Sequence, residues 1–571
     1  MKEKIKIGIV NRLFYIIPIA LTILALCFGC VFLGEADDAY LGLIARSYDF
    51  NNHSEYLVFI NFLLGYAVRW LYLIIPSIDW FSVLYLFAIN ISFITIFKAF
   101  FDSVEVFSFD KVFAVIIIAG IFIYNLSHLG FTNISFMCCC SAIIWALSHI
   151  KKIDRKSLPH LLYVFFLFLF GFCMRNGMVL YSVLVVLVPV LFSLFLNKKF
   201  RVVSVIAVLI VCVSASLFAT YSQKIYEHKY NYEQYVEFNI ARADVIDSGK
   251  LDYNKNEAKL IDDNVTKNDF ELFSDDYIIA DNSVFSLEHV SDIAESRDLN
   301  DRYTLTVSDF FKSLIRKDLS STLIFWFTIR FLILFIIIAI YAFVVYPKLR
   351  TNIILFAPLL FASEMYLFFR RRAVERVINP VAEIGIILIL YFIINYEHLA
   401  NEKILKSTIN NTKKKMFLAC LPILMICSMF SYMGSYTTRS PVDSEVLNYD
   451  YSEFSDNVIV TSAIDSHAFY DMHHSLLSSK HLTAPVYTVC GEWYIYSDYW
   501  DALLNKLELS EYNDCGIKSL IDDRVLFACD STETLDRLVI YFKEHHNINV
   551  KYELVKEFDD SESALYKFVV I

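Results

Sequence analysis

Long apolar runs separated by short polar breaks occupy most of the chain as far as residue 434. Eleven of these runs are long enough to cross a hydrocarbon core as helices of roughly 20 residues. They lie near 14–33, 80–101, 112–129, 131–149, 158–174, 177–196, 202–221, 323–346, 351–369, 377–396 and 416–434. The pattern predicts a polytopic α-helical membrane protein with about eleven transmembrane helices.

A twelfth apolar run, 56–75, decides the sidedness of the others. It contains Asn61 and Arg69 and is followed by a proline. Short loops on the cytoplasmic side of a membrane carry an excess of Lys and Arg. The basic clusters lie at 151–156, 198–201, 348–350 and 413–415. All four share the side of the basic N-terminus only if 56–75 does not span. We therefore expect an amphipathic helix at the outer interface, inside a first outer loop of 34–79, with Arg69 and Asn61 on its wetter face.

From about residue 435 the pattern changes to short β-branched runs that alternate with amphipathic helices. Strands are predicted at 457–461, 486–489, 524–528, 551–555 and 564–570, and helices at 465–478, 497–507 and 532–545. The chain therefore divides into a transmembrane domain, 1–434, and an outer α/β domain, 435–571. Three histidines of the second domain are expected on its surface: His467, His473 and His474.

Another polar region, 222–322, interrupts the apolar runs on the same outer side. It is longer than a connection requires. Helices are expected near 233–247, 257–262 and 286–297. Its acid pairs, Asp262-Asp263 and Asp275-Asp276, are interpreted as solvated surface.

Composition agrees with a membrane protein, because 57% of the residues are hydrophobic and the mean hydropathy is +0.51. The net charge of -11 comes from the two polar regions and implies no nucleic-acid surface. Nine of the twelve cysteines lie in apolar runs and act there as small hydrophobic side chains. The other three, Cys490, Cys515 and Cys529, leave at least one thiol free.

Three acids, Glu35, Asp37 and Asp38, stand where the first apolar run stops. Acids at the mouth of a membrane helix either cap and solvate it or act on a molecule at the membrane surface. Four arginines gather on the same predicted side, against the usual charge bias: Arg370, Arg371, Arg372 and Arg376. Guanidinium groups bind phosphate in a bidentate manner, so this cluster suggests a lipid-linked phosphate, with Arg175 as a fifth cation.

These groups suit glycosyl transfer from a lipid phosphate. The acceptor hydroxyl must lose its proton as it attacks the anomeric carbon, and a nearby carboxylate can take that proton as general base. The leaving group is already a phosphate anion, which arginines stabilise. The chemistry requires that tertiary packing bring the acids and the arginine cluster together.

At this point the chain resembles the GT-C superfamily of integral-membrane glycosyltransferases. The resemblance rests on Glu35-Ala-Asp37-Asp38-Ala-Tyr-Leu, on Phe59-Ile-Asn61-Phe-Leu-Leu-Gly65 in the interfacial segment, and on many spans followed by an outer α/β domain. It implies a catalytic acid in the first outer loop and a polyprenyl-phosphate sugar, of the undecaprenyl type, as donor. The acceptor implied is a cell-surface glycan or teichoic-type polymer at the outer face of a bacterial plasma membrane.

By this resemblance Asp38 or Asp37 is the base and Glu35 a supporting acid. Nothing in the sequence separates the two aspartates. Some members of the superfamily hold a divalent cation, Mg²⁺ or Mn²⁺, at such acids and others do not, so Asp37 and Asp38 are also the metal candidates. The expected substrate and phosphate contacts are Arg371, Arg372, Arg376, Arg370, Arg175, Arg69, Asn61 and His53.

Two other functions stay open on the sequence. A polysaccharide polymerase or ligase also uses outer loops and arginines on lipid-linked substrates. A flippase or transporter of lipid-linked sugars would place charges inside the spans, where Glu364 and Glu383 are the main examples.

Overall fold

The structure is a computed structural model. It describes residues 2–28, 30, 31, 33, 36–46, 54–101, 109–150, 154–176, 202–246, 253, 257, 260, 265–276, 278–295, 330–369, 375–399, 454, 456–461, 486–488, 495–529, 531–557 and 564–571. The predicted spans 177–196 and 416–434 lie outside these residues, as do His467, His473 and His474. The boundary expected at 435 lies outside them too.

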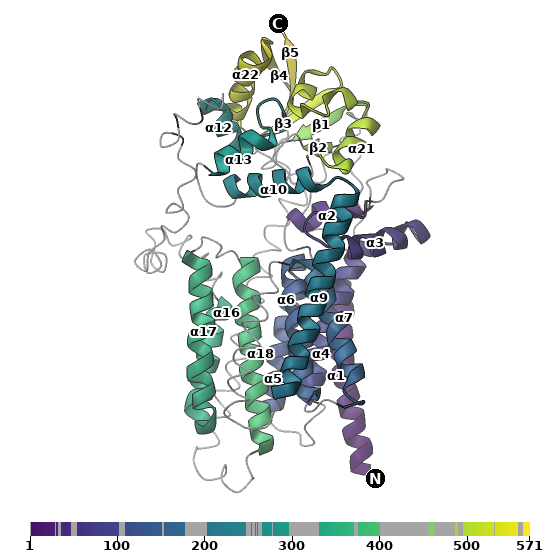
Figure 1. The fold of residues 1–571 in the computed structure, drawn as a ribbon, viewed down its shortest axis with the longest axis vertical. Coiled ribbons are helices and arrows are strands. Elements are labelled where there is room, and N and C mark those ends of the chain that lie inside the picture. Colours follow the sequence, from purple (N-terminus) through teal and green to yellow (C-terminus); the bar gives the residue numbers. More distant parts are fainter. Residues whose placement is uncertain are drawn as a thin grey trace.

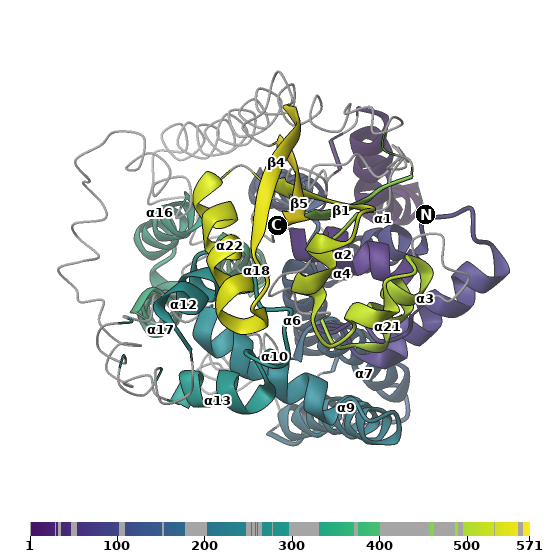
Figure 2. The same cartoon turned by 90° about the horizontal axis from the view of Figure 1, so that it is seen from above.

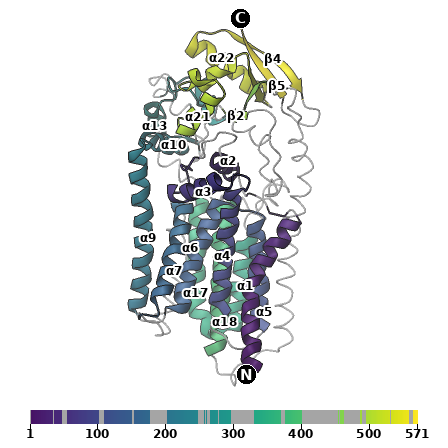
Figure 3. The same ribbon diagram turned by 90° about the vertical axis from the view of Figure 1, so that its right-hand side faces the viewer.

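A bundle of roughly parallel helices carries a smaller layer of strands and helices at one end (Figures 1 and 3). The end with the β-sheet is called the sheet end here, and the opposite end, where the chain begins, the N-terminal end. The bundle helices are α1 (Lys2–Cys27), α4 (Trp80–Phe101), α5 (Phe109–Leu126), α6 (Phe131–His149), α7 (Leu158–Met174), α9 (Val202–Lys229), α16 (Arg330–Val345), α17 (Arg350–Phe369) and α18 (Glu375–Leu399).

Four of these helices, α4, α6, α9 and α18, are long and apolar enough to cross a membrane. Helices α5, α7 and α16 and part of α1 are apolar but shorter. The sequence pattern therefore predicted helices correctly in this part of the chain. Helix α6 is buried along nearly its whole length and forms the centre of the bundle.

Two short helices lie across the sheet end of the bundle. They are α2 (Ala36–Arg46) and α3 (Phe62–Ile74), and α3 runs nearly perpendicular to the bundle (Figure 1). One side of α3 is buried through Gly65, Val68 and Tyr72, whereas large apolar and aromatic side chains such as Trp70 are exposed on the other. The helix is shorter than the predicted 56–75, because Asn61 caps its N-terminus: Asn61 Oδ1 accepts the Leu63 N–H at 3.0 Å.

Helix α9 continues beyond the predicted end of its span, 221, as far as Lys229. Its exposed apolar side chains recur every three or four residues, which gives a single stripe along the outside of the bundle. The stripe consists of Val203, Ile206, Ile210, Val213, Leu217, Phe218, Tyr221 and Ile225. The last turns of α9 reach the level of α2 and α3 (Figure 3).

The C-terminal sheet has five strands in the order β2-β1-β3-β5-β4. They are β1 (Val458–Thr461), β2 (Val486–Thr488), β3 (Val525–Cys529), β4 (Val550–Glu557) and β5 (Ala564–Val570). Strands β2, β1 and β3 are parallel, and β5 and β4 continue the sheet in antiparallel pairing. All five predicted strands are present, with ends that differ from the prediction by at most two residues. The continuous apolar sequence of β3 fits a central strand that is buried on both faces.

Helices α21 (Asp498–Lys506) and α22 (Thr532–His546) accompany the sheet, as the sequence predicts. Ser497 and Ser531 cap their N-termini, and Asn547 ends α22 in the left-handed conformation with φ of 52°. The helix predicted at 465–478 lies outside the described residues. Seen from the sheet end, α21 lies close to α3 (Figure 2).

The polar region after α9 packs against this sheet layer. It contains α10 (Glu233–Ile246), α12 (Lys267–Ser274) and α13 (Leu287–Glu295), and α12 contacts α22. The interpretation of Asp275-Asp276 as solvated surface is wrong for Asp276, which is buried. Asp276 accepts hydrogen bonds from Thr534 Oγ1 and Arg537 Nη1, each at 2.9 Å. Segment 265–295 and the C-terminal strands therefore share one core.

Candidate functional site

The two aspartates of the first loop occupy the first turn of α2 at the sheet end of the bundle. Asp38 is fully buried. Its Oδ1 atom accepts a hydrogen bond from the Tyr85 hydroxyl of α4 at 2.8 Å and another from the Phe131 N–H at 2.9 Å. Phe131 is the first residue of α6, so the carboxylate lies at a helix N-terminus, where backbone N–H groups favour negative charge. Asp38 thereby fixes α2 to α4 and α6.

Gly130 allows this close approach. A methyl group at Gly130 would stand 3.1 Å from Asp38 Oδ2, which is tighter than an ordinary contact. The preceding bridge between Leu33 and Leu129 brings the end of the first apolar run beside the same turn. The Gly130 turn therefore determines how far the Asp38 carboxylate enters the bundle.

Asp37 has a different environment from its neighbour. Its Oδ2 atom lies 2.9 Å from Nη1 of Arg376 on α18, and the two side chains are 29% and 28% exposed. The structure thus brings together one acid of the first loop and one arginine of the predicted cluster. Of the two aspartates, Asp37 is the one whose carboxylate reaches solvent.

A polar stripe runs from Arg376 along α18 into the bundle. Asn379 and Glu383 follow at the spacing of one helix face, and both are fully buried. Asn379 Nδ2 donates to the Tyr124 hydroxyl at 2.8 Å, and Asn125 Nδ2 donates to Glu383 Oε2 at 2.9 Å. Both partners belong to the last turn of α5. Polar groups buried at this depth in an apolar bundle are expensive, so we treat the stripe as part of the candidate site.

A second guanidinium group lies beside this stripe. The Arg330 Cζ atom lies 4.8 Å from the centre of the Tyr124 ring, and the Tyr124 ring stacks on His128 at 4.4 Å between centroids. Arg330 begins α16. Tyr124 therefore makes two contacts in the site. Its hydroxyl accepts the hydrogen bond from Asn379, and the Arg330 guanidinium group lies over the face of its ring.

Arg175 lies at the N-terminus of α6, where it contacts Thr132 and Phe131. Its Nη1 atom donates to Thr132 Oγ1, and its guanidinium carbon lies 4.8 Å from the centre of the Phe131 ring. It terminates α7 in extended backbone. Because Phe131 is also the donor to Asp38, Arg175 and Asp38 are organised by the same residue.

The other predicted contacts are placed differently. Arg69 forms an ion pair with Glu55, and Asn61 Nδ2 donates to the Ala219 carbonyl of α9 at 2.9 Å while its Oδ1 caps α3. These contacts position α3. Glu35, His53, Arg370, Arg371 and Arg372 lie outside the described residues.

Several residues of the site were not identified from the sequence. They are Tyr85, Tyr124, Asn125, His128, Gly130, Arg330 and Asn379. One signal was available: Arg376, Asn379 and Glu383 form a polar face in an otherwise apolar run. Tyr85 and the Phe131 N–H carry no such signal, because their role depends on chain segments far apart in sequence.

Carboxylates suit Mg²⁺ or Mn²⁺, but two of them do not make a site. Asp37 already pairs with Arg376, and Asp38 Oδ1 already accepts two hydrogen bonds. Among the described residues, no group of three His, Cys, Asp or Glu ligands includes either aspartate. Among the described residues the two aspartates therefore do not complete a cation site, and the chemistry proposed below uses the protein side chains alone.

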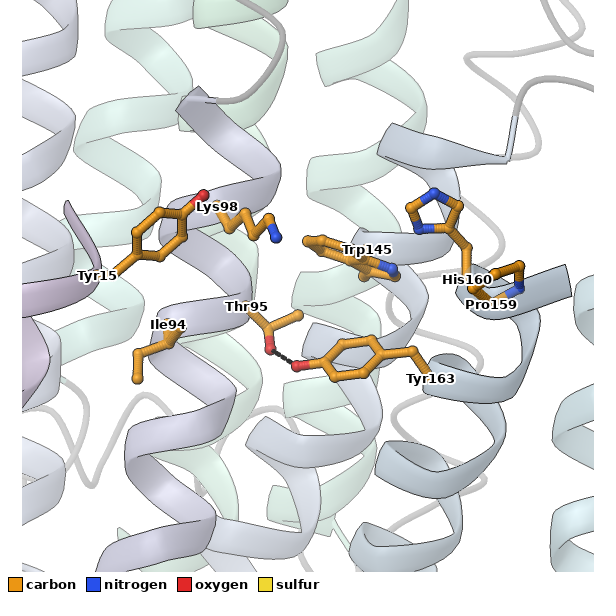
Figure 4. A pocket seen from close by; sticks show the side chains of 8 residues that line it. All are labelled: Tyr15, Ile94, Thr95, Lys98, Trp145, Pro159, His160 and Tyr163. Atoms are coloured by element: carbon orange, nitrogen blue, oxygen red, sulfur yellow. Dashed lines mark hydrogen bonds between the residues drawn. The ribbon is translucent and has the colours of Figure 1, made fainter. Parts of the chain in front are cut away.

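The N-terminal end of the bundle contains a separate cavity of about 450 Å³. Figure 4 shows Lys98 between the rings of Tyr15 and Trp145, with Thr95 hydrogen-bonded to Tyr163. Phe131 and Trp145 are 14 residues apart on α6 (145 − 131), roughly 21 Å at 1.5 Å per residue. This cavity is therefore distant from the aspartates and is not part of their site.

Comparison with models of known protein families, with curated proteins and with solved structures finds no match to this chain. A function for this chain therefore has to be inferred from the geometry of the site.

Proposed function

We propose that the protein is a membrane glycosyltransferase that moves a sugar from a polyprenyl-phosphate carrier to a cell-envelope glycan or teichoic-type polymer. The observation that carries the proposal is the Asp37–Arg376 pair beside the buried Asp38. It supplies an accessible carboxylate and a guanidinium group at the end of a membrane bundle, which are the two groups that the reaction requires.

In the proposed step Asp37 accepts the proton of the acceptor hydroxyl. The hydroxyl oxygen then forms a bond to the anomeric carbon, and the bond from that carbon to the phosphate oxygen breaks. The electron pair leaves with the polyprenyl phosphate, whose charge is stabilised by Arg376. Because Arg376 pairs with Asp37 at 2.9 Å before the donor binds, transfer of Arg376 to the phosphate releases the carboxylate to act as base.

Asp38 is assigned a positioning role. Its Oδ1 is held by Tyr85 and by the Phe131 N–H, and no part of its side chain is exposed. These contacts fix the first turn of α2 and so fix Asp37. Arg175 and Arg330, each held over an aromatic ring near the same helix ends, are assigned to further contacts with the phosphate.

The length of the exposed apolar stripe on α9 supports this assignment. The exposed apolar stripe of α9 covers 22 steps of the helix (225 − 203), roughly 33 Å at 1.5 Å per residue, close to the thickness of a hydrocarbon core. The sheet end of α9 then emerges at the level of α3, where a lipid phosphate would lie. We propose that this end faces the outside of a bacterial plasma membrane and that the chain has eleven spans, with 1–434 as transmembrane domain and 435–571 as outer domain.

The test compares cell-envelope glycans from cells that carry the wild-type chain, Asp37→Asn or no chain, using mass spectrometry. The matched control is Lys267→Gln, which removes an exposed pair with Glu271 in the sheet layer. We expect one sugar to disappear without the chain and with Asp37→Asn, and to remain with the control. The purified protein should also release undecaprenyl phosphate when given its sugar-linked form and the unmodified glycan.

An unchanged sugar content with a stably inserted Asp37→Asn protein would refute the proposal. A change in glycan chain length with no change in sugar composition would favour a polymerase or ligase. Movement of a labelled lipid-linked sugar across liposomes without any acceptor would favour a transporter, for which the buried Glu383 is the relevant group.

A further inference from the structure

A buried cluster of three different ligand types lies in the sheet layer, away from the aspartates of α2. It consists of Asp281, Cys515 and His546, whose ligand atoms all lie within 4.8 Å of one another. His546 Nε2 is 2.8 Å from Asp281 Oδ2 and 3.8 Å from Cys515 Sγ. The residues are nearly inaccessible: Asp281 and Cys515 are 1% and 8% exposed, and the His546 side chain is 6% exposed.

The local structure holds Asp281 in one orientation. Its Oδ1 atom accepts hydrogen bonds from the Ser283 N–H at 2.9 Å and from Ser283 Oγ at 2.6 Å. Its Oδ2 atom is thereby turned toward His546, and it also accepts the Tyr541 hydroxyl at 2.8 Å. Hydrogen bonds of this kind orient the carboxylate ligands of metal sites.

The cluster joins three separate segments. Asp281 comes from the region between α12 and α13, and it forms an isolated β-bridge with Cys515. Cys515 precedes the short helix η6 (Gly516–Ile521), and His546 is the last residue of α22. No sequence motif connects these residues, which explains why the spacing of the cysteines gives no metal signal.

A fourth polar group supports a ligand at this place. The Tyr496 hydroxyl is buried and has no hydrogen-bond partner among the described residues. Burial first, and then the charge of Asp281, raise the pKa of Tyr496 well above its ordinary value. Tyr496 also has a φ of 61°, a left-handed conformation that costs energy for a bulky residue and that functional sites often retain.

The donor set identifies the type of cation. One thiolate, one imidazole and one carboxylate together are typical of Zn²⁺ and unsuited to Mg²⁺ or Ca²⁺. Tetrahedral bonds of about 2.0–2.3 Å place ligand atoms roughly 3.3–3.8 Å apart. The sulfur–nitrogen distance of 3.8 Å meets this requirement, and the nitrogen–oxygen distance of 2.8 Å needs to open only slightly.

We propose that Asp281, Cys515 and His546 bind Zn²⁺. The ion would bind segment 265–295 to the C-terminal sheet and would replace the hydrogen bond between Asp281 and His546. This proposal is independent of the proposed transferase activity, because none of its residues touches the α2 aspartates in the described structure.

The full-length protein purified in detergent provides the test. Zinc is measured by plasma mass spectrometry before and after EDTA treatment and reloading with Zn²⁺, and Co²⁺ is added to the EDTA-treated protein as a spectroscopic probe. The site variants are Cys515→Ser and His546→Gln. The matched controls are Cys529→Ser, a buried thiol in β3, and His545→Gln, which removes the neighbouring histidine paired with Asp269.

We expect about one zinc ion per chain in the wild type and both controls, and loss of the ion in both site variants. Co²⁺ should give the thiolate charge-transfer band in the wild type, and Zn²⁺ should raise its thermal unfolding temperature. The wild-type measurements decide the question even if a site variant fails to fold. Absence of both stoichiometric zinc and the Co²⁺ band in the wild type would overturn the proposal, as would full zinc content in folded Cys515→Ser.

Discussion

Arg376 Nη1 lies 2.9 Å from Asp37 Oδ2, although the two residues are 339 positions apart in the chain. The ion pair is partly exposed, and such pairs contribute only about 0–1 kcal/mol to stability. Asp37→Asn should therefore unfold within a few degrees of the wild type and lose about 10²–10⁴-fold in sugar transfer, the usual range for a general base. Thermal unfolding in detergent and the rate of undecaprenyl phosphate release measure the two effects. A large loss of stability with transfer intact would show that Asp37 is structural.

Tyr85→Phe tests the support of Asp38. The change removes the hydroxyl that donates to Asp38 Oδ1 at 2.8 Å and leaves the Phe131 N–H in place. We expect a loss of about 1–3 kcal/mol in unfolding free energy, because a buried acceptor loses one partner. Tyr163→Phe, which removes a hydrogen bond to Thr95 at the N-terminal end, is the control for the substitution itself. Equal transfer rates in the two variants would contradict a positioning role for Asp38.

Gly130→Ala alters the site with a single methyl group. That group would stand 3.1 Å from Asp38 Oδ2, and the carboxylate has to move away from the α6 N-terminus. Transfer should fall more than in Gly42→Ala, where the added methyl group meets the apolar ring of the buried Phe81 at 3.3 Å and no charged group. The comparison uses the transfer rate divided by the amount of folded protein on size-exclusion chromatography. Similar rates would mean that the position of Asp38 is not critical.

Asn125→Asp would place a second carboxylate about 2.9 Å from Glu383 inside the bundle. Two carboxyl groups buried at this distance cannot both be ionised, and keeping one protonated or holding a second charge there costs more than one lost hydrogen bond. Asn125→Asp should therefore be much less stable than Glu383→Gln, and the double variant Asn125→Asp with Glu383→Gln should recover part of the loss. Thermal unfolding of the four proteins gives the coupling. Independent effects of the two substitutions would place Asn125 and Glu383 out of contact.

Arg537→Gln tests the contact between the polar region after α9 and the C-terminal sheet. It leaves the buried Asp276 without its cation, and breaking such a pair from one side costs about 3–5 kcal/mol. We expect faster proteolysis in the sheet layer and normal stability of the bundle. Lys551→Gln, which affects an exposed pair with Glu553 on β4, is the control. Equal proteolysis of the two variants would indicate that segment 265–295 is held by other contacts.

The elements of the fold were predictable where local patterns determine them. The five strands follow from short β-branched runs, and the bundle helices follow from apolar runs, because both are set by neighbouring residues. Helix α12 was missed because its amphipathic sequence is only eight residues long. The Thr266–Asp269 capping box at its start was the local signal that could have identified it. The length of α9 was underestimated because its last turns are polar.

The candidate site depends on contacts that no local pattern encodes. Tyr85 and Asp38 are 47 positions apart, and Phe131 and Asp38 are 93 apart. Both aspartates could be selected from the sequence, but their roles could not be distinguished. The distinction depends on the burial of Asp38 and on the pairing of Asp37 with Arg376. Arg376 could be selected from the sequence because its charge is unusual beside an apolar run. Tyr124 and Asn125 carry no such signal, because their roles depend on hydrogen bonds with Asn379 and Glu383.

Helix α9 runs without interruption from the bundle into the sheet layer, and the Tyr232 hydroxyl just beyond it donates to Asp498 of α21 at 2.9 Å. A helix of 28 residues is about 42 Å long and stiff along its axis. A tilt of α9 is expected to reach α21 through this hydrogen bond. If the proposed function is correct, we expect the thickness of the bilayer to affect how readily the acceptor reaches Asp37.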